Sequence, residues 1–189
     1  MKQLFCAIVG RGVGWIWYFL STILDDYSRY IISWRLTTTM AAADVTDTLE
    51  DALKMTGLSK ARVRHKPRLL SGNGPCYISG ELKSYLKAQD MEHTRKAPYH
   101  PQTQGKIERY HRSMKNVVKL EHYYYPWELE KAIAEWVEHY NHERYHESLD
   151  NVTPVGVYEC RRNDILDQRT VVKSRTMTQR KIHNPQLAG

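Results

Sequence analysis

Apolar and aromatic residues gather in three short runs near the start of this chain, and turn-forming residues separate the runs. The runs cover residues 4–9, 15–24 and 29–36. An Arg-Gly-Val-Gly segment at residues 11–14 separates the first two runs, and Asp25 and Asp26 lie between the second and the third. Strand-forming residues bounded by such turns predict three strands in an antiparallel meander.

Helical periodicity begins after the meander and alternates with two further short strands. Apolar residues recur at helical spacing over residues 42–55, and Gly57 ends that run. The other predicted helices cover residues 80–88, 102–120 and 127–145, and the short strands cover residues 68–71 and 91–94. This order predicts an α/β fold with a mixed five-stranded sheet and helices on both of its faces.

The segment 102–120 carries two stripes when its residues are placed about 100° apart around a helix. One stripe is apolar and is predicted to pack on the sheet: Ile107, Tyr110, Met114, Val117 and Val118. The other stripe is charged: Glu108, Arg112, Lys115 and Lys119. The charged stripe is either a solvated face, with a Glu108–Arg112 pair worth about 0.3–0.5 kcal/mol, or a metal-binding carboxylate followed by phosphate-binding cations.

The helix predicted at residues 127–145 has an apolar face and a group of histidines near its end. The apolar face consists of Leu129, Ile133, Trp136, Val137 and Tyr140. His139, His142 and His146 share a second face, which is compatible with either zinc binding or structural hydrogen bonds. We favour hydrogen bonds.

The composition indicates one basic domain with a core of its own. The 189 residues are 41% hydrophobic, which is enough to form a core. The net charge of +7 favours a polyanionic partner through attraction to phosphates. Cys6, Cys76 and Cys160 form no C-x-x-C pair, which suits a reducing cytoplasm. Residues 13–24 are apolar but too short to span a bilayer.

The basic charge is concentrated toward the end of the chain. Residues 161–189 carry seven Lys or Arg against two Asp. Such a segment is either a flexible tail or a short helix, and in both cases a plausible phosphate contact. We therefore expect a core over residues 1–158 and a basic C-terminal tail over residues 159–189.

Four motifs in order resemble bacterial insertion-sequence transposases, whose catalytic core is of the retroviral-integrase type. They read W-Y-F-L-S-T-I-L-D-D-Y-S-R-Y-I from residue 17, L-L-S-G-N-G-P from residue 69, A-P-Y-H-P-Q-T-Q-G-K-I-E-R-Y-H from residue 97 and Y-N-H-E-R-Y-H from residue 140. The resemblance covers about residues 14–158. It implies a ribonuclease-H-like fold and an Asp, Asp, Glu triad that holds Mg²⁺ or Mn²⁺ for 3′-end cleavage and strand transfer of DNA.

Within this resemblance, only one of the three acidic ligands is present. Glu108 matches the Glu of the triad, and Gly72 stands at the position of the second Asp, with 35 residues between them. The first Asp belongs on the opening strand, but the chain has no Asp or Glu before Asp25. Asp25 and Asp26 match a scaffold turn of the family and are expected to form a turn. Metal binding is therefore expected to be weak or lost.

The opening strand matches the family poorly, and an upstream helix-turn-helix region of the family is missing. Both features suggest a truncated or rearranged N-terminus. The function we favour is that of an inactive transposase core, a pseudoenzyme of a mobile element. It is expected to bind DNA in the bacterial cytoplasm near the nucleoid, and assembly with itself or with intact copies is compatible with this role. No membrane or small-molecule substrate is implied.

The expected nucleic-acid-binding residues are Lys106, Arg109, Arg112, Lys115 and Lys119. Two alternatives remain open at this stage. The chain is an active DNA-strand-transferring transposase if its other ligands lie elsewhere, and it is a plain nucleic-acid-binding module if the four motifs are coincidental.

Overall fold

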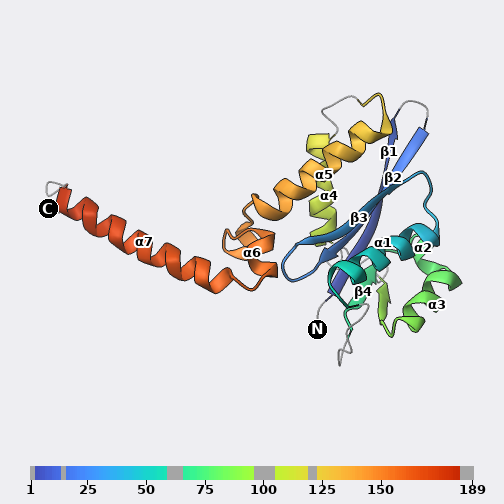
Figure 1. Ribbon diagram of the computed structural model, residues 1–189, viewed down its shortest axis with the longest axis horizontal. Helices are drawn as coiled ribbons and strands as arrows, with labels where there is room; N and C mark the ends of the chain where they lie inside the picture. Colours follow the sequence, from blue (N-terminus) through green and yellow to red (C-terminus); the bar gives the residue numbers. More distant parts are fainter. Residues whose placement is uncertain (1–2, 14–15, 59–65, 96–104, 119–122, 184–189) are drawn as a thin grey trace.

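Five strands form a single mixed sheet at the centre of the molecule (Figure 1). The computed structural model describes residues 3–13, 16–58, 66–95, 105–118 and 123–183, with side chains described from Trp17 onward. The strands are β1 (Gln3–Val13), β2 (Ile16–Asp25), β3 (Ile31–Thr37), β4 (Arg68–Ser71) and β5 (His93–Arg95), in the spatial order β3-β2-β1-β4-β5. The first three are antiparallel neighbours, whereas β1 pairs with β4 and β4 with β5 in parallel.

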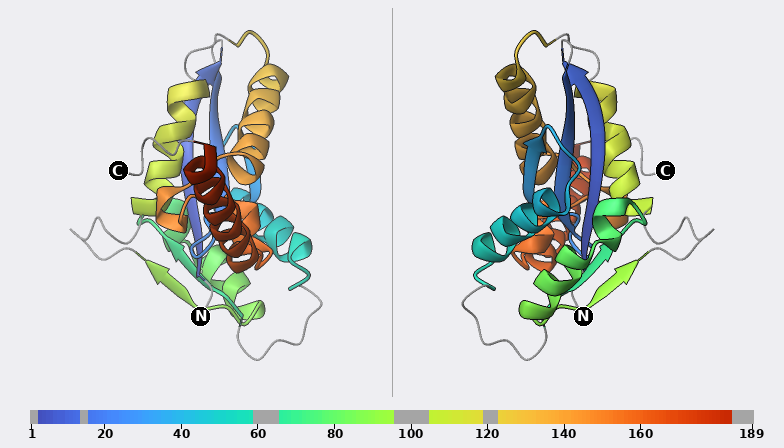
Figure 2. Two further views of the ribbon diagram at one scale, coloured as in Figure 1. Left: turned by 90° about the vertical axis from the view of Figure 1, so that its left-hand side faces the viewer. Right: turned by 90° about the vertical axis from the view of Figure 1, so that its right-hand side faces the viewer.

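The helices follow the order that periodicity predicted, with additional short ones. They are α1 (Ala42–Met55), α2 (Pro75–Ile78), α3 (Gly80–Ala88), α4 (Gly105–Val118), α5 (Pro126–His142), the 3-10 turn η2 (Glu147–Leu149), α6 (Pro154–Tyr158) and α7 (Arg162–His183). The bounds of α1, α3 and β4 are those predicted. Figure 2 shows α4 and α5 running beside the long strands β1 and β2.

Helices cover both faces of the sheet, as predicted, because neighbouring residues on a strand point to opposite sides. Ile23, Ile32 and Leu69 belong to one buried cluster, which contains the apolar residues of α1, α2 and α3. Their immediate neighbours Leu24, Ile31 and Leu70 belong to a second cluster, which contains those of α4 and α5. Both faces of β2, β3 and β4 are therefore buried. This is why their sequences are apolar runs without a polar face.

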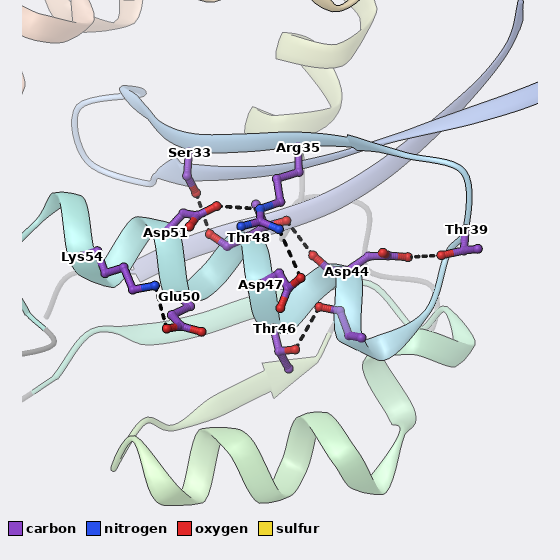
Figure 3. Close-up of polar contacts among 11 residues, drawn as sticks. Ser33, Arg35, Thr39, Asp44, Thr46, Asp47, Thr48, Glu50, Asp51 and Lys54 are labelled. Atoms are coloured by element: carbon purple, nitrogen blue, oxygen red, sulfur yellow. Dashed lines mark hydrogen bonds and ion pairs between the residues drawn. The ribbon is translucent and has the colours of Figure 1, made fainter. Parts of the chain in front are cut away.

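Polar contacts fix α1 against β3 (Figure 3). The Ser33 hydroxyl donates to the Thr48 carbonyl at 2.8 Å in the buried interior. Arg35 Nε donates to Asp51 Oδ2 at 2.6 Å, and Arg35 Nη1 donates to Asp47 Oδ2 at 3.1 Å. The arginine pairs are partly exposed and so contribute little stability, which leaves the buried apolar face of α1 as its main attachment.

A single asparagine joins α5 to the edge of the sheet. Asn141 Oδ1 accepts from the Ile31 N–H at 2.9 Å, and Asn141 Nδ2 donates to the Ile31 carbonyl at 3.0 Å. Asn141 is only 4% exposed. The side chain thus binds the backbone of the edge strand β3 much as a neighbouring strand would.

The predicted turn at residues 11–14 is wrong in its position. Arg11, Gly12 and Val13 continue β1 and pair with Tyr18, Trp17 and Ile16 of β2, and residues 14–15 lie outside the described residues. Glycine indicated a turn locally, but the continuing ladder with β2 satisfies the backbone groups of this segment. The third strand also begins later than predicted, because Arg29 adopts a positive φ of 66° and belongs to the preceding turn.

The described part of the C-terminal segment is a longer helix than the short one expected. It forms α7, which is 22 residues long, contains no glycine or proline, and has no buried residue. Figure 1 shows α7 extending away from the sheet. Because its sequence is polar, no apolar periodicity indicated how long this helix would be.

The bridge from Asn141 to Ile31 predicts a large effect on stability. We expect Asn141→Ala to lower the free energy of unfolding by about 2 to 4 kcal/mol, because two buried backbone groups of Ile31 lose their partners. Urea denaturation measures the change. The exposed Asn116→Ala on α4 is the matched control and should stay within about 0.5 kcal/mol of the parent. An equally small effect at Asn141 would show that water or relaxation replaces the bridge.

Candidate metal and nucleic-acid site

The parallel pairing of β1 with β4 sets the backbone frame of the candidate metal site. Cys6 of β1 lies opposite Ser71, the last residue of β4, and Gly72 follows directly. The 11 residues of β1, Gln-Leu-Phe-Cys-Ala-Ile-Val-Gly-Arg-Gly-Val, contain no Asp or Glu. Neither the strand nor the turn beside it therefore offers a carboxylate at this place.

Glu108 lies in the first turn of α4, and its side chain is exposed. The preceding residue, Ile107, is fully buried in the same cluster as Leu70, which lies two residues before Gly72. The beginning of α4 is therefore on the face of the sheet reached by Leu70. That Glu108 approaches the turn containing Gly72 stays a prediction from the motifs.

The side chains present do not fit a two-magnesium centre. Mg²⁺ prefers hard oxygen ligands, and two ions held roughly 3.5 to 4 Å apart need several carboxylates. Gly72 has no donor atom, and Glu108 supplies one carboxylate. In the part of the chain that the structure describes, no group of three or more His, Cys, Asp or Glu residues could hold a metal ion.

Asp25 and Asp26 both have structural partners. Asp25 Oδ2 accepts from the Ser28 N–H at 2.9 Å and from the Ser28 hydroxyl at 2.6 Å, which closes the turn between β2 and β3. Asp26 Oδ1 accepts from Lys106 Nζ at 2.5 Å. These contacts support the expected scaffold role of the pair and also join the turn to the first turn of α4.

The predicted cations of α4 differ in their surroundings. Arg109 and Arg112 are exposed, and Lys115 is half-buried. Lys106 forms an ion pair with Asp26, so part of its positive charge is neutralised within the fold. Lys119 lies outside the described residues. The exposed face of α4 therefore presents Arg109, Arg112 and Lys115 beside Glu108.

The apolar stripe of α4 needs one correction. Ile107, Tyr110, Met114 and Val118 are buried as predicted, but Val117 is 48% exposed. His111 is buried instead, at 5% exposure. Both residues lie at the edge of the stripe, and a neutral imidazole there packs against the Tyr110 ring, whose centroid is 5.2 Å away.

The burial of His111 has an electrostatic consequence. Loss of water, with a smaller contribution from Lys115, lowers the pKa of His111 to about 3. Its Nε2 atom has no hydrogen-bond partner. The imidazole is therefore neutral at physiological pH, and charging it would oppose folding.

The three histidines around the end of α5 have separate partners. His139 Nδ1 lies 3.0 Å from Glu143 Oε2, and His142 Nε2 lies 3.7 Å from Glu138 Oε1. His146 packs its ring edge against Tyr140, with 4.9 Å between centroids. The hydrogen bond expected in place of a zinc site is thus present at His139, whereas His146 Nε2 has no partner.

An arginine group that sequence reasoning missed surrounds Tyr140 and His146. Burial, with smaller contributions from Arg144, Arg29 and Arg109, lowers the pKa of His146 to about 4. These arginines come from the turn between β2 and β3, from α4 and from the segment after α5. Arg29 lies in the D-D-Y-S-R motif and Arg144 in the Y-N-H-E-R motif, and this was the sequence signal that could have pointed to them. That the arginines lie near one another depends on tertiary packing.

Comparison with known proteins gives two matches to protein-family models. A model described as "Integrase core domain" matches residues 5–101, and a second model with the same description matches residues 89–154. Together they span the sheet, α4 and α5. Of the helices in the described part of the chain, none is long and apolar enough to cross a membrane.

Curated relatives include proteins of mouse and of its retroelements. The chain is 45% identical over 60 residues to an IgE-binding protein of Mus musculus, covering 31% of this chain and 10% of the relative. It is 26% identical over 115 residues to the Gag-Pro-Pol polyprotein of mouse mammary tumor virus (strain BR6), covering 59% of this chain and 6% of the relative. The chain thus spans a tenth or less of these relatives.

Solved structures of similar fold include viral and transposon proteins. The HTLV-2 integrase catalytic core domain in complex with magnesium, in its trimeric form, has a TM-score of 0.62 at 17% identity, covering 80% of this chain and 92% of that one. The Mos1 transposase catalytic domain with Raltegravir and Mn has a TM-score of 0.60 at 17% identity, covering 71% and 69%. These likenesses show the fold.

The buried, neutral His111 predicts a dependence of stability on pH. An unfolded histidine has a pKa of about 6.5, so between about pH 6.5 and 3 the unfolded chain binds a proton that the folded chain does not. Stability should fall with decreasing pH in this window, by at most about 1.4 kcal/mol per pH unit from this residue.

Urea denaturation at pH 7 and pH 5 measures this effect. The loss between the two pH values should be about 2 kcal/mol smaller in His111→Gln than in the parent. The exposed His183→Gln is the control and should keep the parental loss. Equal losses in all three proteins would mean that His111 is protonated in the folded state.

Proposed function

Because this chain belongs to the family of integrase core domains, we propose that it is an integrase-type core that binds DNA but does not cut or join it. The observation that carries the proposal is a contrast within one part of the fold. The exposed face of α4 keeps its cations, whereas the end of β4 and all of β1 lack the carboxylates that metal chemistry needs.

The missing ligands argue against catalysis. The HTLV-2 core was solved with magnesium and the Mos1 domain with manganese or magnesium, so Mg²⁺ or Mn²⁺ is the cofactor to expect in the family. Here Glu108 alone remains, with Gly72 at the second position. A single carboxylate holds Mg²⁺ weakly, because the ion keeps most of its water when few protein oxygens are offered.

The cations that support DNA binding do not depend on the metal ligands. Arg109 and Arg112 are exposed on α4, and the tail contributes further positive charge through α7. Binding through such groups releases counterions from the DNA, so it needs no base contact and no metal. We propose residues 1–158 as the core and residues 159–189 as its basic extension.

The retroviral relatives also suggest assembly on DNA. A simian T-cell lymphotropic virus integrase was solved as an intasome, and the HTLV-2 core in dimeric and trimeric forms. By analogy, this core associates with further copies of itself when it binds DNA. The narrower assignment to a bacterial insertion-sequence element rests on the four sequence motifs alone, since the relatives named above come from retroviruses, mouse and a mariner transposon.

The first test is enzymatic. In Mg²⁺ or Mn²⁺ the chain should show no detectable cleavage or strand transfer of labelled DNA ends, since metal ions supply several kcal/mol of transition-state stabilisation and each 1.36 kcal/mol is tenfold in rate. Gly72→Asp alone should not restore activity, because β1 still lacks a carboxylate. Cleavage that Glu108→Gln abolishes would show that other residues complete the metal site.

The second test is DNA binding as a function of salt. Affinity for duplex DNA should be sequence-tolerant, with a dissociation constant of about 10⁻⁴ to 10⁻⁶ M near physiological salt. Reversing Arg112 and Lys115 to Glu should weaken binding and flatten the plot of log K against log salt. The matched control is Lys131→Glu with Lys83→Glu, two exposed lysines on α5 and α3.

Glu108→Gln refines this second test. It removes a negative charge next to Arg112 and should leave binding equal or slightly tighter, whereas a metal-dependent mode of binding would be weakened. If the Arg112 and Lys115 reversal behaved like its control, α4 would be a solvated face, and the DNA contacts would have to come from α7.

A further inference from the structure

A polar pocket lies where the turn between β2 and β3 meets the beginnings of α4 and α7. Its volume is about 290 Å³. The polar side chains that line it are Asp26, Tyr27, Arg29, Lys106, Ser148 and Arg162. Three of these are cations and one is a carboxylate, so the pocket carries net positive charge.

Structural contacts hold the three cations in place. Arg29 lies in the turn, where its backbone N–H donates to the Asp25 carbonyl at 2.9 Å, and its guanidinium lies 3.6 Å from Asp26 Oδ1. Lys106 Nζ is 2.5 Å from Asp26 Oδ1, and Arg162 forms an ion pair with Asp150. The cations therefore face the pocket without having to be ordered by a ligand, which lowers the entropic cost of binding.

Two guanidinium nitrogens at this pocket have no acceptor. Arg29 Nη1 and Arg162 Nε are both buried, and neither has a hydrogen-bond partner. The nearest carboxylate oxygen to Arg29 Nη1, Asp26 Oδ1, is 3.6 Å away, beyond hydrogen-bond distance. A shielded donor without a partner is unfavourable, and an oxyanion entering the pocket would supply the missing acceptor.

Further arginines lie around this pocket. Burial is the main cause that lowers the pKa of Arg29; Asp26, Tyr140 and Asp25 counteract it, and Arg109 adds a smaller contribution to the lowering. Arg109, Arg144 and Arg29 together act on His146, as described above. A positive field in a partly dry site attracts and retains anions more strongly than the same charges on an open surface.

The pocket is also the end of a row of cations on α4. Lys106, Arg109, Arg112 and Lys115 follow one another at intervals of three residues. Residues three apart on a helix are neighbours, but each such step turns about 60° around the axis, so the row winds about half way around α4 from Lys106 to Lys115. A phosphate held in the pocket is thus next to the first member of a row of cations that leads to the face proposed above to contact DNA.

We propose that this pocket binds a phosphate group, and that in the DNA complex it holds one phosphate of the DNA backbone. Arg29 and Arg162 donate to the phosphate oxygens, and Lys106 shares its charge between the phosphate and Asp26. The assignment to a DNA phosphate rests on the proposed function, whereas the binding of phosphate itself rests on the pocket alone.

The first arm of the test uses inorganic phosphate. The full chain, labelled with ¹⁵N, is titrated with phosphate at constant ionic strength, and amide shifts of residues 26–29 and 162 report on binding. Saturable shifts are expected with phosphate but not with chloride. Arg162→Gln and Lys106→Gln should each weaken phosphate binding at least about fivefold, a loss of about 1 kcal/mol.

The matched control for this arm is Arg175→Gln. It removes the same charge from an exposed position elsewhere on α7 and should leave phosphate affinity unchanged. Asp26→Asn gives an independent reading, because removing the one carboxylate of the pocket should tighten phosphate binding if the chain stays folded by circular dichroism. Equal phosphate affinity in Arg162→Gln, Lys106→Gln and Arg175→Gln would overturn the proposal.

The second arm distinguishes DNA phosphate from free phosphate. Arg162→Gln should weaken binding of duplex DNA more than Arg175→Gln does, and phosphate should compete with DNA in the parent but less in Arg162→Gln. If Arg162→Gln loses phosphate but binds DNA like the control, the pocket takes free phosphate and the DNA assignment is wrong. If the chain binds phosphate but no DNA, the proposed function fails and the pocket stands.

Discussion

The bridge between Asn141 and Ile31 is the contact on which the C-terminal half of the molecule depends. The edge strand β3 ends the sheet, and the Asn141 carboxamide occupies both backbone groups of Ile31 there. This brings the end of α5 to the turn between β2 and β3. Tyr30 in that turn then stacks on Tyr158 of α6, with 4.5 Å between ring centroids. Everything after α5 is positioned from this one edge.

The phosphate pocket is a consequence of that arrangement. Its walls come from the β2–β3 turn, from the beginning of α4 and from segments after α5, and the attachment of α5 to β3 helps to bring them together. The Asp26–Lys106 pair connects two of the walls directly. Phosphate binding and metal chemistry thus rely on different residues of one framework, so the loss of carboxylates near Gly72 leaves the cationic surface intact.

A concentration of arginines within a small fold has an electrostatic cost, and the structure shows how it is offset. Arg144 lies over the rings of Trp136 and Tyr140, at 5.7 and 5.8 Å from their centroids, so aromatic faces partly replace water around its charge. Arg29 has Asp26 nearby but keeps a nitrogen without a partner. The remaining repulsion would be relieved by an anion, as expected for a polyanion-binding protein.

The sequence by itself determined the elements whose signal is local. Periodicity and turn residues predicted α1, α3 and β4 with their observed bounds, and buried apolar runs predicted helices on both faces. The motifs also matched Glu108 and Gly72 to two positions of the family triad, and their approach in space stays a prediction. The missing ligands needed no structure at all, since a residue type is read directly from the chain.

Tertiary structure decided what depends on partners distant in sequence. Val117 and His111 both lie at the edge of the apolar stripe of α4. Packing against the sheet decided that His111 is buried and Val117 is exposed. The sequence alone gave Lys106 no partner, but in the fold its Nζ atom lies 2.5 Å from Oδ1 of Asp26, which is 80 residues earlier in the chain. The convergence of Arg29 and Arg162 has the same origin. Local patterns report which face a side chain takes on its own element, whereas the partner it meets is set by how those elements pack.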